Sequence, residues 1–300
     1  MIDPPTFDDR GAAVPPPPEA PPAPATGPVE LSDAAVGAPV AIAVEDLSVD
    51  YRAHRWSPPV QALTGVTFDV AVGTTTAVIG ESGSGKSTLA RVLGELRRGS
   101  RFRIVGGDAR ILGHAVRDAS AARLDRLRLV VGFLEQDAAT RLDGQLTVAE
   151  NIGQPILLRD KRWDRRDLEY RAAALLDRVH LPLTMMHRFP YELSSGQRQR
   201  VAIARSLVLE PSVWIADEPG RGVDATLADL VPELIATERG SRPFSAVVVS
   251  HELAFGAGID QIVVLERGAV IGLSTPDRLF DEADHPFVIA LRGLTGRAGR

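Results

Sequence analysis

One segment constrains the fold of this chain more than any other, namely Gly80-Glu81-Ser82-Gly83-Ser84-Gly85-Lys86-Ser87. It satisfies the pattern G-x-x-x-x-G-K-[ST] and lies between a predicted strand, Thr75–Ile79, and a predicted helix, Ser87–Leu96. Glycines allow successive backbone N–H groups to turn toward a phosphate, and the following helix presents its positive end. The pattern predicts that Lys86 reaches the β- and γ-phosphates of a nucleotide and that the Ser87 hydroxyl binds Mg²⁺. The chain has only two lysines against 32 arginines, and one of them stands here, where a compact charge fits among phosphates.

A pair of carboxylates gives a second chemical signal. Asp217 and Glu218 follow directly after the apolar strand predicted at Ser212–Ala216. A strand buried on both faces has no structural reason to end in two acids. Together with the phosphate loop, the pair predicts that Asp217 holds the Mg²⁺ shell and that Glu218 polarises the attacking water.

The remaining pattern indicates an α/β nucleotide-binding core. Two segments rich in β-branched residues predict an antiparallel opening sheet, and a capping box at Thr147–Glu150 begins a helix. The two opening strands are expected at Ala41–Leu47 and Val66–Val72. A further helix is expected at Arg165–Val179, a strand at Ala246–Ser250 and a hairpin-like pair of strands around Gly268.

The most specific segment is Leu193-Ser194-Ser195-Gly196-Gln197, followed by RQRVAIAR. Its serine pair can cap a helix that ends before Pro211. Here the chain resembles the ATP-binding cassette (ABC) family, whose signature is LSGGQ, over residues 41–290. The resemblance implies an ABC-type P-loop NTPase with a RecA-like core, an antiparallel β subdomain and a helical subdomain that carries the signature.

The resemblance also assigns roles to residues that occur in the family's order. It implies ATP and Mg²⁺ as cofactors, with Tyr51 stacking on adenine and Ser87, Gln136 and Asp217 at the metal. Glu218, His251 and Gln136 are then the catalytic residues. The nucleotide-binding residues would be Tyr51, the loop from Gly80 through Ser87, Thr88, Asp217, Ser194, Ser195, Gly196, Gln197 and Asp224.

Two departures from the family pattern stand out. Ser195 replaces a glycine of the signature, which the family docks on the nucleotide of the opposite subunit through backbone N–H groups. The added hydroxyl could weaken closure or add a hydrogen bond, and both outcomes stay open. The segment Gly220-Arg221-Gly222-Val223-Asp224 stands where Thr-Ser-Ala-Leu-Asp is common.

The domain organisation follows from composition and from the resemblance. Residues 1–40 hold eleven of the 22 prolines and are expected to form a disordered tail. We expect the nucleotide-binding domain over residues 41–274, with its helical subdomain at about 138–208. Residues 275–300 resemble a C-terminal extension of peptide-importer type that contains His285-Pro286-Phe287.

Within the family, FPYELSSGQRQRVAIARSLVLEPSVWIADEP is similar to the ATPase subunits of oligopeptide and dipeptide importers. The resemblance implies a second ABC ATPase subunit, two permease subunits and, indirectly, an extracytoplasmic substrate-binding protein as partners. The alternatives are a soluble ABC ATPase of a metabolic complex, as in phosphonate metabolism, or the ATPase of a nickel or other small-solute importer.

Composition excludes several other classes. The chain has no cysteine, so disulfides, thiolate metal sites and cysteine nucleophiles are ruled out. Its net charge of −5 resides entirely in residues 1–40, and no basic stripe points to nucleic acid. Composition also predicts no transmembrane segment and no signal peptide. The resemblance to importer ATPases implies a peripheral location on the cytoplasmic face of the inner membrane.

Overall fold

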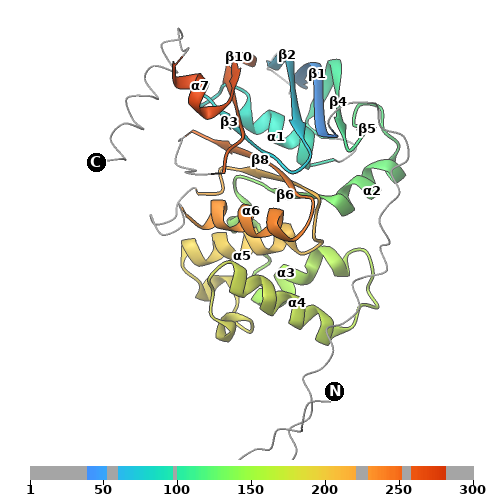
Figure 1. Cartoon of the computed structure of the whole chain (residues 1–300). Coiled ribbons are helices and arrows are strands. Elements are labelled where there is room, and N and C mark those ends of the chain that lie inside the picture. Colours follow the sequence, from blue (N-terminus) through green and yellow to red (C-terminus); the bar gives the residue numbers. More distant parts are fainter. Residues whose placement is uncertain (1–38, 53–59, 97–99, 221–228, 252–257, 282–300) are drawn as a thin grey trace, which may run out of the picture. The chain divides into compact units, whose positions relative to one another are not determined.

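The structure is a computed structural model that describes residues 39–52, 60–96, 100–220, 229–251 and 258–281 (Figure 1). All of these belong to one compact unit, residues 33–300. Most of the predicted proline-rich tail, Asp224 and the segment His285-Pro286-Phe287 lie outside the described residues. The expectations for these parts stay predictions, as do the proposed domain boundaries.

The first sheet is antiparallel, as the opening segments predicted. It consists of β1 (Val40–Tyr51), β2 (Val60–Ala71), β4 (Phe102–Ile111) and β5 (His114–Ala115) in the order β2-β1-β4-β5. Both β1–β2 and β1–β4 pair in antiparallel register. The alternating burial of β1 and β2 places one face of this sheet on the core.

The second sheet is mostly parallel and carries the predicted buried strands. It holds β3 (Thr75–Ile79), β6 (Val131–Leu134), β7 (Val213–Asp217), β8 (Ser245–Ser250), β9 (Gln261–Glu266) and β10 (Ala269–Ser274). Their order is β10-β9-β3-β8-β7-β6, with β10 antiparallel to β9. Every residue of β3, β7 and β8 is buried, which explains their continuous runs of small and apolar side chains. The predicted hairpin is confirmed, because Gly268 at φ 84° joins β9 to β10.

Helix α1 (Lys86–Gly94) begins at the phosphate loop and contacts strands of both sheets. Its buried side chains and those of the first sheet form one hydrophobic cluster with Val213, Val247 and Val263 of the second. Helix α2 (Ala121–Val130) precedes β6, α6 (Leu230–Ser241) precedes β8, and α7 (Pro276–Asp281) follows β10. The expectation of an α/β nucleotide-binding fold is therefore confirmed.

Between β6 and β7 the described chain is helical. It forms α3 (Val148–Leu157), α4 (Arg165–Arg178), α5 (Ser195–Leu207) and the short helices η1 (Ala138–Arg141), η2 (Leu183–Met185) and η3 (Pro190–Glu192). In Figure 1, α3, α4 and α5 lie together below the sheet. The predicted capping box is present, since Thr147 and Glu150 bond each other's backbone N–H groups at the start of α3.

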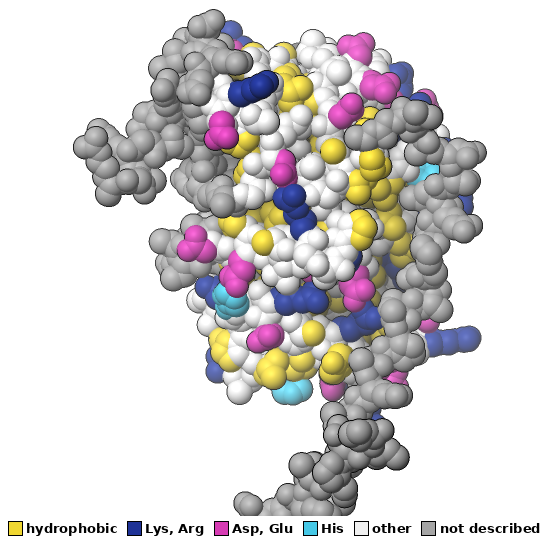
Figure 2. Space-filling model, viewed as in Figure 1, with side chains coloured by type: hydrophobic (Ala, Val, Ile, Leu, Met, Phe, Trp, Pro, Cys, Tyr) yellow, Lys and Arg dark blue, Asp and Glu magenta, His cyan; other side chains and the backbone are white. Residues whose placement is uncertain are grey.

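Charges of both signs are interspersed on the face shown in Figure 2. Among the described helices, none has the length and apolarity needed to cross a bilayer.

Candidate nucleotide site

Several of the predicted site residues lie at the ends of four neighbouring strands. The strand order β3-β8-β7-β6 is parallel throughout, so the carboxyl ends of these strands meet at one edge of the sheet. Gly80 follows β3, His251 follows β8, Asp217 ends β7, and Gln136 lies two residues beyond β6. Sheet order thus brings together segments up to 171 positions apart, Gly80 and His251, at the edge where α/β proteins bind ligands.

The phosphate loop has two glycines that the fold itself requires. A Cβ at Gly80 would stand 2.1 Å from the carbonyl oxygen of Leu265 in β9. A Cβ at Gly85 would meet the carbonyl oxygen of Ala62 in β2 at 2.6 Å, and the φ of 103° at Gly85 is itself unfavourable for other residues. The loop is therefore clamped between the second sheet and the first.

Lys86 is buried within this loop, with only 6% of its surface exposed. Its ammonium donates hydrogen bonds to the carbonyl oxygens of Gly80 at 2.7 Å and Glu81 at 2.8 Å. Burial lowers the pKa of Lys86 below its usual value, and the carboxylates of Glu218 and Asp217 partly oppose this shift. The lysine thus links the two ends of the loop and faces the acid pair.

Ser87 and Asp217 meet across the site although 130 positions separate them. The Ser87 hydroxyl donates to Oδ1 of Asp217 at 3.1 Å. Burial raises the pKa of Asp217 to about 6, against an opposing effect of that hydrogen bond. A hydroxyl and a carboxylate are oxygen donors of the kind that Mg²⁺ prefers, and a cation here would stabilise the ionised carboxylate. The residues present therefore fit a bound Mg²⁺.

Glu218 and His251 form a close polar pair in the site. Oε2 of Glu218 lies 2.7 Å from Nδ1 of His251. Since an ionised carboxylate only accepts hydrogen bonds, Nδ1 carries the proton in this arrangement. The Glu218 side chain is 10% exposed, whereas that of His251 is 56% exposed. The pair can orient a water molecule on the carboxylate and present the imidazole toward a ligand.

Tyr51, at the end of β1, turns toward the helix that follows the phosphate loop. Its hydroxyl lies 3.2 Å from Oγ1 of Thr88 and accepts a hydrogen bond from Nη1 of Arg91 at 3.2 Å. Two predicted nucleotide-binding residues, Tyr51 and Thr88, are thus in direct contact. Arg91 joins them, and sequence reasoning missed it because an arginine within a helix carries no distinguishing pattern.

The signature residues occupy a different part of the fold. Ser194 caps α5 by accepting from the N–H of Gln197 at 3.2 Å, and Gln197 returns a bond to the N–H of Ser194. The predicted serine cap is therefore confirmed, with Ser194 as the capping residue. Ser194 and Ser195 are exposed, and α5 packs on α3, α4 and β6 rather than on α1. The signature is thus exposed at the start of α5, on a different helix from the one that follows the phosphate loop.

Two supporting contacts were not anticipated from the sequence. Gly268 donates its N–H to the carbonyl of Ser84 at 2.9 Å, so the β9–β10 turn holds the phosphate loop. The side-chain amide of Gln199 in α5 donates to the carbonyl of Pro219, directly after the acid pair, at 2.9 Å. Neither contact has a local sequence signal.

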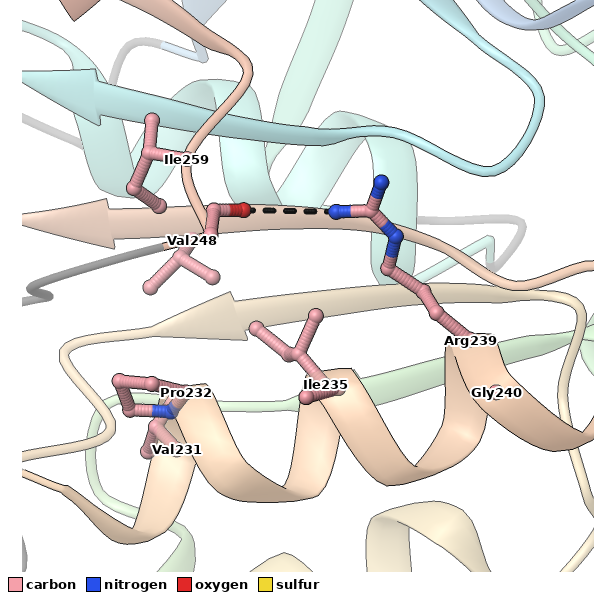
Figure 3. A pocket seen from close by; sticks show the side chains of 9 residues that line it. Val231, Pro232, Ile235, Arg239, Gly240, Val248 and Ile259 are labelled. Carbon is pink, nitrogen blue, oxygen red and sulfur yellow. Dashed lines mark hydrogen bonds between the residues drawn. The ribbon is translucent and has the colours of Figure 1, made fainter.

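A cavity of about 330 Å³ lies between α6 and β8, apart from these residues (Figure 3). Val231 and Ile235 of α6, Val248 of β8 and Ile259 line it. Arg239 stands at its edge and bonds Oδ2 of Asp260 at 2.9 Å. The cavity includes none of the predicted site residues.

Comparisons with known proteins agree with this geometry. A family model described as ABC transporter matches residues 63–221. Oligopeptide transport ATP-binding protein OppF of Escherichia coli (strain K12) is 31% identical over 263 residues, covering 85% of this chain and 77% of that protein. Di/tripeptide transport ATP-binding protein DppF of Pseudomonas aeruginosa (strain UCBPP-PA14) is 32% identical over 259 residues, covering 85% and 78%.

Solved structures give the same result. The dimeric post-hydrolysis structure of the ATP-binding cassette MJ0796 bound to ADP and Pi has a TM-score of 0.70. It is 25% identical, and the alignment covers 78% of this chain and 98% of that one. With the phosphate loop, the acid pair and the signature helix in place, the chain belongs to the ABC transporter family as an ABC-type ATPase.

Proposed function

We propose that this chain is the ATP-hydrolysing subunit of an importer for di- or oligopeptides. The observation that carries the catalytic assignment is the Glu218–His251 contact of 2.7 Å at the strand edge that also bears Lys86. The assignment of a peptide as the transported solute rests on the similar proteins OppF and DppF, which are named as peptide transport ATP-binding proteins.

The nucleotide would lie across the phosphate loop, with Lys86 beneath the β- and γ-phosphates and Tyr51 at the adenine. Ser87 and Asp217 would hold Mg²⁺, with Gln136 reaching the same position from the end of β6. A bound Mg²⁺ neutralises charge on the phosphate oxygens. Asp217 must be ionised for this role. Burial raises its pKa to about 6, and the positive charge of a bound cation would stabilise the ionised carboxylate against that effect.

Glu218 would act on the attacking water as a general base or as an orienting acceptor. His251 is bonded to that carboxylate and is more exposed, so it would reach toward the γ-phosphate from β8. Binding rests on Lys86 and the loop, whereas turnover rests on Glu218. The two functions are therefore separable by mutation.

The exposed signature supports a pairing in which two cassettes complete each other's sites. Ser194, Ser195, Gly196 and Gln197 would contact the nucleotide of a second ABC ATPase subunit, as would Asp224, which lies outside the described residues. Two permease subunits would bind this pair at the cytoplasmic face of the membrane, with a substrate-binding protein delivering the peptide. The dimeric structure of the cassette MJ0796 supports the pairing by analogy.

The test compares ATP hydrolysis and ATP binding in purified full-length protein. Glu218→Gln should lose turnover while keeping ATP affinity, because the amide cannot accept the water's proton. Glu169→Gln, on the exposed surface of α4, serves as the matched control and should hydrolyse ATP at the wild-type rate. Wild-type turnover in Glu218→Gln would disprove the catalytic assignment.

The cargo needs a separate test in cells. Deleting the chain should abolish uptake of a radiolabelled di- or tripeptide, and the wild-type gene, but not the Glu218→Gln variant, should restore it. Unchanged peptide uptake, or loss of nickel uptake alone, would overturn the peptide assignment without touching the ATPase.

A further inference from the structure

The hydrogen bond between Gln199 and Pro219 joins the signature helix α5 to the turn that follows the acid pair. Gln199 is buried, with 3% of its surface exposed, and its side-chain amide donates to the Pro219 carbonyl at 2.9 Å. Pro219 follows Glu218 directly. The amide therefore reaches from the first turns of the signature helix to the backbone of the catalytic turn.

The turn that Gln199 contacts is strained. Glu218 has a φ of 51°, in the left-handed region that few residues other than glycine adopt. A residue before proline is further restricted by the proline ring, which favours extended conformations. Such a backbone persists only where its surroundings hold it in place, and strain of this kind concentrates at functional sites.

Two hydrogen bonds hold this turn from opposite sides. The N–H of Glu218 donates to the carbonyl of Val249 in β8 at 2.9 Å, which fixes the turn to the sheet. Gln199 fixes the next carbonyl to α5. The direction of the Glu218 carboxylate, and hence its contact with His251, depends on both attachments.

Gln199 also lies close to the exposed signature. Ser195 is the first residue of α5 and Gln199 is four positions later, so the two share one face of the first turns of the helix. A displacement of the helix N-terminus is carried to Gln199 because the hydrogen-bonded backbone is stiff over so short a distance.

We propose that Gln199 is a positioning residue that couples the signature helix to Glu218 of the same chain. Docking of Ser195 on the nucleotide of a second cassette would then align the carboxylate at this chain's own site. This inference rests on the proposed function, since it takes Glu218 as the group that acts on water. It adds a physical connection between the two ATP sites of a dimer, each of which is completed by the signature of the other cassette.

The chain offers a matched control at the other end of the same helix. Oγ of Ser206 accepts a hydrogen bond from Nε1 of Trp214 at 3.0 Å, which ties α5 to the start of β7. Gln199 ties α5 to the residues just beyond the end of β7. Losing either bond leaves a buried polar group without its partner, so both changes should lower stability similarly. Only the loss at Gln199 should disturb the catalytic turn.

The experiment measures steady-state ATP hydrolysis of full-length wild type, Gln199→Met, Ser206→Ala and Glu218→Gln over a range of protein concentrations. Methionine keeps the length of glutamine and removes the donor. We expect kcat of Gln199→Met to fall roughly 10- to 100-fold, the range seen when a reacting group is displaced by about 1 Å. Its KM for ATP should stay within about twofold, since Lys86 and the loop are unchanged.

A second readout tests the coupling itself. Dimer formation with a non-hydrolysable ATP analogue, followed by light scattering, should be normal in Gln199→Met. The rise of turnover per cassette with protein concentration should nevertheless be much smaller than in wild type, because the dimer no longer aligns Glu218. Ser206→Ala should keep both properties at a similarly lowered melting temperature.

The outcomes separate this inference from the proposed function. If Glu218→Gln keeps wild-type turnover, the catalytic assignment fails. If Glu218→Gln is inactive but Gln199→Met matches Ser206→Ala in kcat and in concentration dependence, Gln199 is structural only and the coupling is refuted. Should Gln199→Met not fold, Gln199→Asn, whose shorter amide cannot span the distance, is judged by the same criteria.

Discussion

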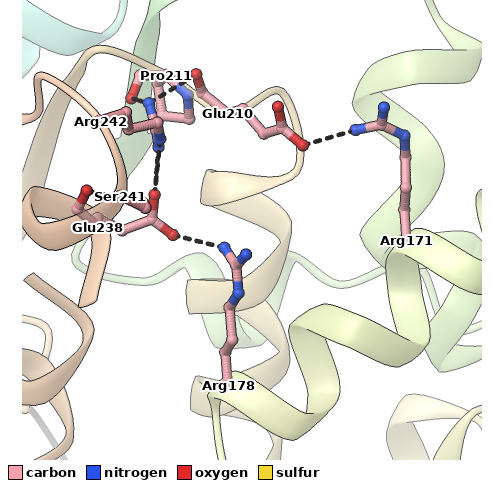
Figure 4. A network of polar contacts seen from close by, with 7 residues as sticks. All are labelled: Arg171, Arg178, Glu210, Pro211, Glu238, Ser241 and Arg242. Carbon is pink, nitrogen blue, oxygen red and sulfur yellow. Dashed lines mark hydrogen bonds and ion pairs between the residues drawn. The ribbon is translucent and has the colours of Figure 1, made fainter. Parts of the chain in front are cut away.

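Glu238 of α6 provides a sharp test of how the helical elements are attached to the sheet (Figure 4). Its side chain is 3% exposed and accepts hydrogen bonds from Arg178 of α4 at 2.6 Å and from Nε of Arg242 at 2.8 Å. Arg242 also donates to the carbonyl of Glu210 at 2.9 Å, at the connection from α5 to β7. One carboxylate thus joins three segments, and Glu238→Ala removes it.

The loss of folding free energy expected for Glu238→Ala depends on how well the two arginines can be solvated or paired once the carboxylate is gone. Removing one partner of a buried ion pair typically costs about 3–5 kcal/mol, because the other charge stays buried without compensation. Here Arg178 is 43% exposed and can rehydrate, and Arg242 keeps its carbonyl partners. We therefore expect the lower end of the range, about 3 kcal/mol. For a protein of this size that corresponds to a fall in melting temperature of about 6–12 °C.

The assay is thermal and urea unfolding of full-length protein without nucleotide. Glu233→Ala, on the same helix, removes an exposed carboxylate 3.5 Å from His180 and should change stability by less than about 0.5 kcal/mol. Arg178→Ala alone should cost only about 1 kcal/mol, since the buried Glu238 keeps its ion pair with Arg242. A loss below about 1 kcal/mol in Glu238→Ala, or one equal to that of Glu233→Ala, would refute the reasoning.

Three further predictions concern the site. Lys86→Ala should weaken ATP binding roughly 10- to 150-fold, the equivalent of one charge-assisted contact of about 1.5–3 kcal/mol, and unchanged affinity by calorimetry would contradict the assignment. Burial raises the pKa of Asp217 to about 6 in the folded chain, so its charged form opposes folding increasingly as pH rises from about 4 through 6. Without ligand, Asp217→Asn should therefore be more stable than wild type at pH 8, by up to about 3 kcal/mol, and equal to it near pH 4; equal melting temperatures at pH 8 would count against this. Ser195→Gly in an assembled complex should alter the hydrolysis rate at the site that receives this signature, measured with the other site's catalytic glutamate disabled, and two unchanged rates would make Ser195 a neutral variant.

The sequence alone determined the parts of this protein that depend on neighbouring residues. The phosphate loop was predictable because its glycines and Lys86 lie within eight positions. The caps at Thr147 and Ser194 were predictable because each needs only a partner three residues later. The buried strands β3, β7 and β8 were predictable from their continuous runs of small and apolar residues.

Other elements were less visible in the sequence. Strand β4 was not anticipated, because its residues FRIVGGDARI include a pair of glycines and no clean alternation. Its place beside β1 comes from tertiary pairing rather than from its own propensity. The length of β1, which carries Tyr51 to the edge of α1, also exceeded the expected strand.

Only the tertiary structure decided which distant residues meet. The order β3-β8-β7-β6 brings Ser87 to Asp217 and Glu218 to His251, and no local pattern encodes the order of strands in a sheet. The bond from Gln199 to Pro219 likewise joins residues 20 positions apart that no local pattern pairs. Local sequence patterns specify which side chains can bind phosphate, metal or water. The distances between these side chains are set by the packing of helices and strands that lie far apart in the chain.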